Sequence, residues 1–267
     1  MMGAGAGGGA GTPVPIAGGT DLLVHWPVNL AAHDRTYLDL SGVSELRPLC
    51  WTESHLEIGA LATYWDVVRD ERCERELPLL VLAARTVGAI QIQARGTWAG
   101  NIANASPAAD GVPALMALDA TVVLASAGSG GVVREEVRLD DFYLGYKQMR
   151  KRPEQLIELI RVPRRAYAVS VFEKVGARRA QAITKVGAAI ARSDAGWRVV
   201  VNSVGPTVRR CRAVEKMLED GVKVDGPEGF AGALAGDVAA IDDIRSTARY
   251  RERVLGRVLY FALRGVT

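Results

Sequence analysis

The sequence predicts an α+β protein of two parts, with a boundary near Pro163. Apolar residues make up 49% and charged residues 24% of the chain, which is the balance of a soluble globular protein. The first part mixes short strands and helices around two glycine-rich bends. The second part shows three strands followed by helices, which is the order typical of a separate α+β domain.

Charge and cysteine content exclude several functions. The net charge of +3 is too small to indicate nucleic-acid binding. The short basic clusters are interpreted as solvated surface: Arg161, Arg164 and Arg165, then Arg209, Arg210 and Arg212. Without a C-x-x-C pair, we expect the chain to ligate neither an iron–sulfur cluster nor a structural zinc ion.

The cysteines, the apolar runs and the histidines indicate the cellular compartment and whether a metal site is expected. The cysteines, Cys50, Cys73 and Cys211, are sparse and odd in number, which favours a reducing compartment. No apolar run approaches the roughly 18 residues of a membrane span, and no signal peptide is evident, so we expect a cytoplasmic protein. His25, His33 and His55 lack metal-ligand spacing, so no metal site is expected.

The chain up to residue 90 predicts a strand, a glycine bend and then further strands and helices. Residues 1–12 are Gly/Ala-rich and expected to be flexible. Thr63 and Asp66 have the spacing of a capping box, and Gly88 suits a helix end. Strands are expected at 14–17, 36–40 and 51–58, a helical turn at 21–26 after an N-cap at Thr20 or Asp21, and helices at 63–74 and 77–87.

Two bends with little side-chain bulk dominate the first part. Residues 91–119 are interpreted as a long irregular segment containing a turn at 97–101, and 17–21 as a second bend of the same character. Such bends let backbone N–H groups approach a ligand, most often a phosphate. The two segments therefore predict halves of one anion-holding cleft, although two glycines alone are also compatible with a plain tight turn.

The remaining chain predicts strands before helices. A hairpin tip is expected at 128–131, and Pro163 ends a strong strand. The predicted strands are 120–124, 132–139, 156–162, 167–175, 184–192 and 197–204, and the predicted helices are 110–118, 211–219, 228–234 and 244–263. Ile244, Leu255 and Leu259 lie on the predicted apolar face of the last helix.

Four motifs together resemble the FAD-binding medium subunit of the molybdenum hydroxylases, of the carbon monoxide dehydrogenase and xanthine dehydrogenase type. AGGTDL at 17–22 is similar to the first flavin motif of that family, and RGTWAGNIANASPAAD at 95–110 to the second. FEKVG at 172–176, followed by Arg178 and Arg179, resembles the opening of the C-terminal domain. DDIRSTARYR at 242–251 is similar to the final helix. The resemblance covers nearly the whole chain.

The resemblance implies a two-lobed FAD-binding domain of the PCMH (vanillyl-alcohol oxidase-like) type at 1–163. A C-terminal domain with a small three-stranded sheet and helices would follow at 164–267. Ser106 and Asp110 match positions near the ribityl chain and adenosine, and Leu156 and Ile157 match residues beside the isoalloxazine. Lys174 would stabilise the anionic reduced flavin, although by position alone it could be an exposed strand lysine. The implied cofactor-binding residues are Ile16, Ala17, Gly18, Gly19, Thr20, Asp21, Leu22, Thr97, Ala99, Gly100, Asn101, Ala103, Ser106, Asp110, Leu156, Ile157 and Lys174.

The sequence departs from the family pattern at three places. Gly/Ala sequence stands where a strand–helix unit usually precedes the first motif. Ala99 replaces a usual glycine, and Ala182 a common aspartate. Either that unit is lost, which would leave one lobe incomplete, or the start of the sequence is misassigned. We expect the turn at Ala99 to be tighter and one polar contact to be missing.

The implied function is an oxidoreductase subunit without catalytic acid–base residues of its own. It would take electrons from the [2Fe–2S] clusters of a small subunit and pass them to NAD+ or another acceptor. A large subunit would carry the molybdenum cofactor, and the complex would be a dimer of heterotrimers. A self-contained flavin reductase resembling UDP-N-acetylmuramate dehydrogenase, or a non-catalytic nucleotide-binding scaffold, remains the alternative.

Overall fold

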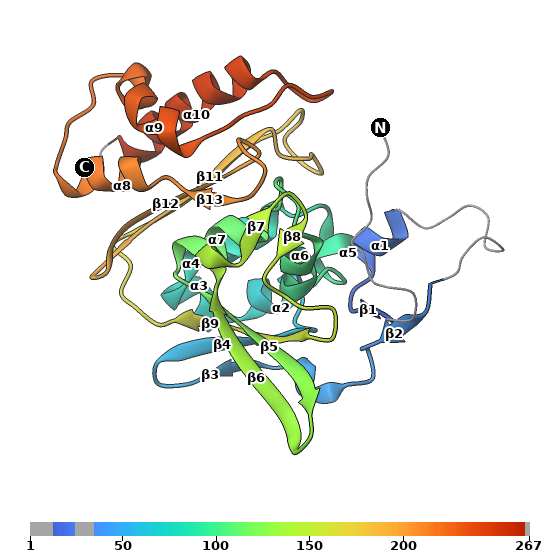
Figure 1. The fold of residues 1–267 in the computed structure, drawn as a ribbon. Coiled ribbons are helices and arrows are strands. Elements are labelled where there is room, and N and C mark those ends of the chain that lie inside the picture. The colour runs from blue at the N-terminus through green and yellow to red at the C-terminus, as the bar shows by residue number, and fades with distance from the viewer. Residues whose placement is uncertain (1–12, 25–34, 265–267) are drawn as a thin grey trace.

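The computed structural model describes residues 13–24 and 35–264. The chain forms successive layers (Figure 1): a five-stranded sheet, a group of helices, a four-stranded sheet and the last helices. One hydrophobic core lies between the two sheets, and a second lies between the four-stranded sheet and the last helices. The predicted mixture of helices and strands is therefore confirmed.

The first elements match the predicted strand, glycine bend and helical turn. β1 pairs in parallel with β2, with Val14 opposite Tyr37. The expected helical turn is present as α1, and its predicted end at 25–26 lies outside the described residues, as do His25, His33 and residues 1–12. The elements of this half are β1 (Val14–Ile16), α1 (Thr20–Val24), β2 (Tyr37–Asp39), β3 (Leu49–Trp51), β4 (His55–Gly59), α2 (Tyr64–Arg69), α3 (Glu71–Glu76), α4 (Pro78–Thr86), α5 (Ile90–Gln93), α6 (Trp98–Asn104) and α7 (Gly111–Ala117).

The five-stranded sheet is antiparallel, in the order β3-β4-β9-β5-β6. The predicted hairpin is confirmed, with Gly128 opposite Gly131 at its tip. The single strand expected at 51–58 is wrong, because Thr52 exchanges hydrogen bonds with the backbone of His55 and turns the chain between two strands. The later strands are β5 (Thr121–Gly128), β6 (Gly131–Arg138), β7 (Tyr143–Gly145), β8 (Gln148–Met149) and β9 (Leu156–Pro163).

The helix expected at 63–74 is two helices. Thr63 and Asp66 form the predicted capping box at the start of α2. The chain then leaves helical geometry at Asp70, whose carboxylate accepts hydrogen bonds from the backbone N–H groups of Arg72 and Cys73 at 2.8 and 3.0 Å. This second N-cap starts α3, since an aspartate in that position satisfies amides that the helix leaves unpaired.

The four-stranded sheet is buried on both faces. Along β11, Ala189 and Ala191 belong to the core between the sheets, while Ala188 and Ile190 face the last helices. This explains the uninterrupted apolar sequence of the strand. The expected three strands are joined by a fourth, two-residue strand. The strands are β10 (Val169–Val175), β11 (Val186–Ser193), β12 (Gly196–Asn202) and β13 (Arg209–Arg210).

The last helices cover the outer face of this sheet (Figure 1). The final helix begins at Ala248, where Thr247 accepts a hydrogen bond from the N–H of Tyr250. The expected start at Ile244 is wrong, and that side chain is fully exposed in a turn. Among the described residues, no helix is long and apolar enough to cross a bilayer. The helices are α8 (Arg212–Glu219), α9 (Ala231–Asp237) and α10 (Ala248–Leu263).

Candidate functional site

The two glycine-rich segments lie against each other. A Cβ atom on Gly18 would stand 1.9 Å from the backbone oxygen of Arg95, so no side chain fits there. A Cβ atom on Gly96 would stand 3.5 Å from the Oγ1 of Thr20. Gly19 has φ +72°, a conformation that glycine adopts without strain. The predicted convergence of the two motifs is therefore confirmed.

The first part of the second segment is helical rather than irregular, which corrects the prediction before residue 110, whereas the helix predicted at 110–118 is present as α7. Thr97 is the N-cap of α6, and its Oγ1 accepts a hydrogen bond from the N–H of Gly100 at 3.0 Å. The N–H of Asn101 donates to the Thr97 carbonyl at 3.0 Å. Ala99 is small and buried in this first turn, and the backbone N–H of Trp98 donates to the carbonyl of Ala62.

Tyr64 is part of this site although sequence reasoning missed it. Its hydroxyl and the Oδ1 of Asn101 are buried and have no hydrogen-bond partner among the described residues. Both atoms border Gly111, where a Cβ would stand 2.9 and 3.0 Å from them. Burial raises the pKa of Tyr64 well above its usual value, and the charges of Asp110 and Asp21 add to the effect. The Tyr64 hydroxyl therefore lies near carboxylates from both segments.

Asp110 and Lys174 form an ion pair of 2.6 Å between the helical layer and β10. The ammonium also donates to the carbonyl of Thr86 at 2.9 Å, and the hydroxyl of Thr184 donates to the other oxygen of Asp110. Burial raises the pKa of Asp110, while the Lys174 ammonium and the Thr184 hydroxyl act in the opposite direction. Lys174 is thus largely buried and paired, in contrast to the alternative of an exposed strand lysine.

The other residues expected to bind the cofactor differ in burial and in position. Ser106 is half-buried in the turn after α6, where its Oγ accepts a hydrogen bond from the N–H of Ala108. Ile157 is buried in the core between the sheets, and its neighbour Leu156 is half-buried. Ala103 is exposed on α6. The structure therefore joins the first motif to the start of α6, and Asp110 to Lys174, while Ile157 contributes to the core.

A hairpin that the sequence analysis did not single out contacts the end of α6. Tyr143, in β7, donates its hydroxyl to the carbonyl of Ile102 at 3.1 Å. Lys147, between β7 and β8, donates to both the backbone oxygen and the Oδ1 of Asn104. No local pattern in the sequence pointed to these contacts, because the partners are distant along the chain.

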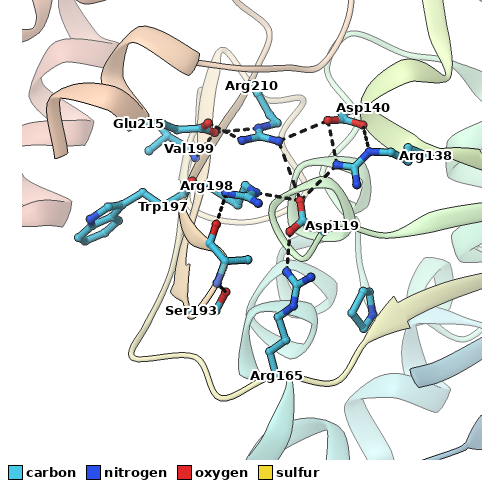
Figure 2. Close-up of polar contacts among 12 residues, drawn as sticks. Asp119, Arg138, Asp140, Arg165, Ser193, Trp197, Arg198, Val199, Arg210 and Glu215 are labelled. Carbon is cyan, nitrogen blue, oxygen red and sulfur yellow. Dashed lines mark hydrogen bonds and ion pairs between the residues drawn. The ribbon is translucent and has the colours of Figure 1, made fainter. Parts of the chain in front are cut away.

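A cluster of ion pairs connects the two regions, as Figure 2 shows. Asp119 accepts hydrogen bonds from Arg165 at 2.7 Å and Arg198 at 2.8 Å, and its side chain is only 6% exposed. Arg210 lies between Asp140 at 3.3 Å and Glu215 at 2.5 Å. The interpretation of the arginine clusters as solvated surface is therefore wrong for Arg165 and Arg210, and also for Arg161 and Arg164, which pair with Glu57 and Glu76. Arg212 is exposed as expected.

These ion pairs outweigh the cost of burying the carboxylates. Burial alone would raise the pKa of Asp119, but its bonds with Arg198 and Arg165 hold that pKa below the usual value. Arg138 and Arg210 lower the pKa of Asp140 in the same way against its burial. The N-terminal and C-terminal regions are thus joined by charged groups as well as by the hydrophobic core.

Two surface hollows accompany the site. One, of about 480 Å³, lies beside Thr63 and Ala94, next to the junction of the two motifs. The other, of about 320 Å³, lies between β10 and α10. Within residues 13–24 and 35–264, no group of three His, Cys, Asp or Glu side chains could hold a metal ion.

Comparisons with known proteins agree with this geometry. Residues 10–165 match the family described as the FAD binding domain in molybdopterin dehydrogenase. The nicotinate dehydrogenase FAD-subunit of Eubacterium barkeri is 33% identical over 190 residues, which are 69% of this chain and 62% of that protein. The carbon monoxide dehydrogenase medium chain of Hydrogenophaga pseudoflava is 28% identical over 255 residues, 93% of this chain and 87% of that one.

A solved structure of carbon monoxide dehydrogenase from Hydrogenophaga pseudoflava, lacking the Mo-pyranopterin moiety of the molybdenum cofactor, has the same fold. Its TM-score is 0.82 at 27% identity, and the match covers 95% of this chain and 89% of that chain. The matched family spans β1 to β9, and with them both glycine-rich motifs. The chain belongs to the family of FAD-binding domains of the molybdopterin dehydrogenases.

Proposed function

We propose that this chain is the electron-transfer subunit of a multi-subunit molybdenum hydroxylase. It carries an FAD-binding domain of that family. The observation that supports the proposal best is the contact of Gly18 with Arg95, which brings the first motif to the start of α6. We assign residues 1–163 to the FAD-binding domain and 164–267 to the C-terminal domain.

The residues present fit a dinucleotide. The Tyr64 hydroxyl and the Asn101 Oδ1 are buried without a partner, and such groups in native proteins usually meet a ligand or a water molecule. Gly18 cannot carry a side chain, which lets the backbones of the two motifs lie directly against each other. Both features lie where the sequence motifs predict the diphosphate.

The chain's own residues would bind and orient the cofactor. The backbone of 18–20 and the first turn of α6, with Thr97, Gly100 and Asn101, would hold the diphosphate. Ser106 and Asp110 would lie near the ribityl chain and the adenosine. Leu156, Ile157 and Lys174 would lie near the ring. FAD supplies one-electron and two-electron redox chemistry when bound. Lys174, fixed by Asp110, would add positive charge in a partly dry site, where electrostatic effects are strong.

The partners follow from the names of the relatives. They are named as FAD subunits and medium chains of dehydrogenases, so we propose a large subunit with the molybdenum cofactor and a small subunit with [2Fe–2S] clusters. The clusters would deliver electrons to this chain, which passes them to NAD+ or another acceptor. A dimer of heterotrimers is the proposed assembly. All three cysteines are free thiols, which supports a reducing, cytoplasmic location.

The test is to purify the full chain, add FAD and measure bound flavin by its visible absorption. One FAD per chain is expected, and a correctly folded chain that binds none contradicts the proposal. The loaded chain is then mixed anaerobically with a reduced [2Fe–2S] protein or with a candidate organic substrate. Bleaching of the flavin by the iron–sulfur protein alone supports an electron-transfer subunit. Direct bleaching by the substrate indicates a self-contained reductase instead.

A further inference from the structure

Lys147 has an uncommon position for a lysine. It lies in the tight turn between β7 and β8 with φ +58°, a left-handed conformation that favours glycine. Its side chain is half-buried, and the ammonium donates to two oxygens of Asn104, one from the backbone and one from the side chain at 2.8 Å. Local strain of this kind persists only where the surroundings hold it in place.

The same hairpin supports the end of α6 twice. Besides the Lys147 contacts, the Tyr143 hydroxyl donates to the carbonyl of Ile102. The last carbonyls of a helix have no partner within it, and α6 ends at Ala105 in a left-handed conformation, φ +48°. The hairpin thus fixes the C-terminal end of the helix whose first turn begins with Thr97 (Figure 1).

The helix that Lys147 contacts begins beside the first motif, because a Cβ atom on Gly18 would stand 1.9 Å from the backbone oxygen of Arg95, two residues before Thr97. Burial lowers the pKa of the Lys147 ammonium, and the carboxylate of Asp21 acts in the opposite direction. The charge of Asp21 also acts on Tyr64, which borders Asn101 through Gly111. Lys147 therefore holds one end of α6 by hydrogen bonds, while the other end of this helix begins beside the first motif.

We propose that Lys147 is a positioning residue of the FAD site, which holds α6 and the first motif in the arrangement that binds the dinucleotide. This inference rests on the proposed function. A lysine that merely capped a helix would contribute to stability and leave affinity for FAD unchanged. A positioning lysine affects affinity, because a displaced α6 carries Thr97 and Asn101 away from the Gly18 bend.

The experiment compares FAD binding by full-length variants, measured by the quenching of FAD fluorescence during titration. Lys147→Met removes the positive charge and both hydrogen bonds to Asn104. Lys147→Arg keeps a charged group that can donate hydrogen bonds. Lys151→Met is the matched control, because Lys151 is also half-buried, has a pKa lowered by burial and donates to a backbone carbonyl, that of Arg152. Circular dichroism without FAD checks that each variant is folded.

We expect K147M to bind FAD about tenfold more weakly, because it loses the two charge-assisted hydrogen bonds that hold α6 and only part of their free energy acts on the affinity. K147R should recover most of this loss and K151M should bind as the wild type does. If the wild type binds FAD and K147M binds it equally tightly, this inference is overturned and the proposed function is not. A wild type that binds no FAD overturns the proposed function, and this inference with it.

Asn104→Ala provides a second test if K147M does not fold. It keeps the lysine and its bond to the backbone oxygen, and removes only the Oδ1 contact. A roughly threefold weaker affinity is expected, the lower range for a single hydrogen bond. An unchanged affinity in a folded N104A protein also overturns the inference.

Discussion

Replacing Asp119 by asparagine tests how the two regions are held together. Asp119 accepts hydrogen bonds from Arg165 and Arg198, both in the C-terminal region, and lies 3.5 Å from Arg138 in its own region. Asparagine has nearly the same size and tolerates the φ of +55° found here. The substitution therefore removes the negative charge while leaving the backbone unstrained.

The expected loss is about 3 kcal/mol in the free energy of unfolding. Removing one partner of a buried ion pair costs about 3–5 kcal/mol. The lower end applies because the side chains of Arg165 and Arg198 are 28% and 18% exposed, so water can partly hydrate them once the carboxylate is gone. For a chain of this size, each kcal/mol shifts the melting temperature by roughly 2 °C, so we expect a decrease of about 6 °C.

The assay is urea unfolding followed by circular dichroism. Asp220→Asn is the control, because Asp220, the residue that ends α8, forms an exposed ion pair with Lys216 of the same helix. Its loss should be below about 0.5 kcal/mol, the usual contribution of such surface pairs. If D119N and D220N lower stability by the same small amount, the ion-pair cluster does not hold the regions together.

The pH dependence gives an independent test of the same residue. The pKa of Asp119 is lower in the folded chain than its usual value near 3.9. Its stabilisation is therefore fully present above about pH 4 and is lost as the pH falls through the lowered folded pKa. The difference in stability between wild type and D119N should shrink below about pH 4, and a difference that stays constant to pH 2 contradicts this assignment.

Two further predictions concern the FAD site. Gly18→Ala should abolish flavin binding, since its Cβ would stand 1.9 Å from the Arg95 oxygen, whereas Gly42→Ala, with open space around it, should retain the flavin absorption of the purified chain. Lys174→Met should cost about 3 kcal/mol in urea unfolding at pH 8, because Asp110 is left charged and buried. This cost should decrease as the pH falls, because the raised pKa of Asp110 lets the carboxylate take up a proton above its usual range. An additional Asp110→Asn substitution should recover much of the cost.

Much of the fold follows from local sequence signals. The capping box at Thr63 and the hairpin between Gly128 and Gly131 were predictable, because each depends on neighbouring residues. The turn at Thr52 and the second N-cap at Asp70 were missed, although runs of polar residues at 52–55 and 69–72 interrupt the apolar pattern at both places. Ile244 was placed in the final helix because it lies four residues before Ala248, although Thr247 begins that helix.

The site was predictable only in part. The motifs around Gly18 and Thr97 were recognised by their small residues, and they do meet. Tyr64 and Lys147 were missed because their roles depend on contacts with residues far along the chain. Arg210 appeared to be surface charge because its acidic partners come from separate elements, so composition alone did not reveal the cluster.

The most direct test of the account is amide hydrogen exchange of the full chain with and without FAD. If residues 16–22 and 95–101 form one dinucleotide site, FAD should slow exchange in both segments together, with half-saturation at the same concentration. Gly18→Ala should remove the protection from both. Protection of only one segment, or of neither while FAD still binds, would contradict the account.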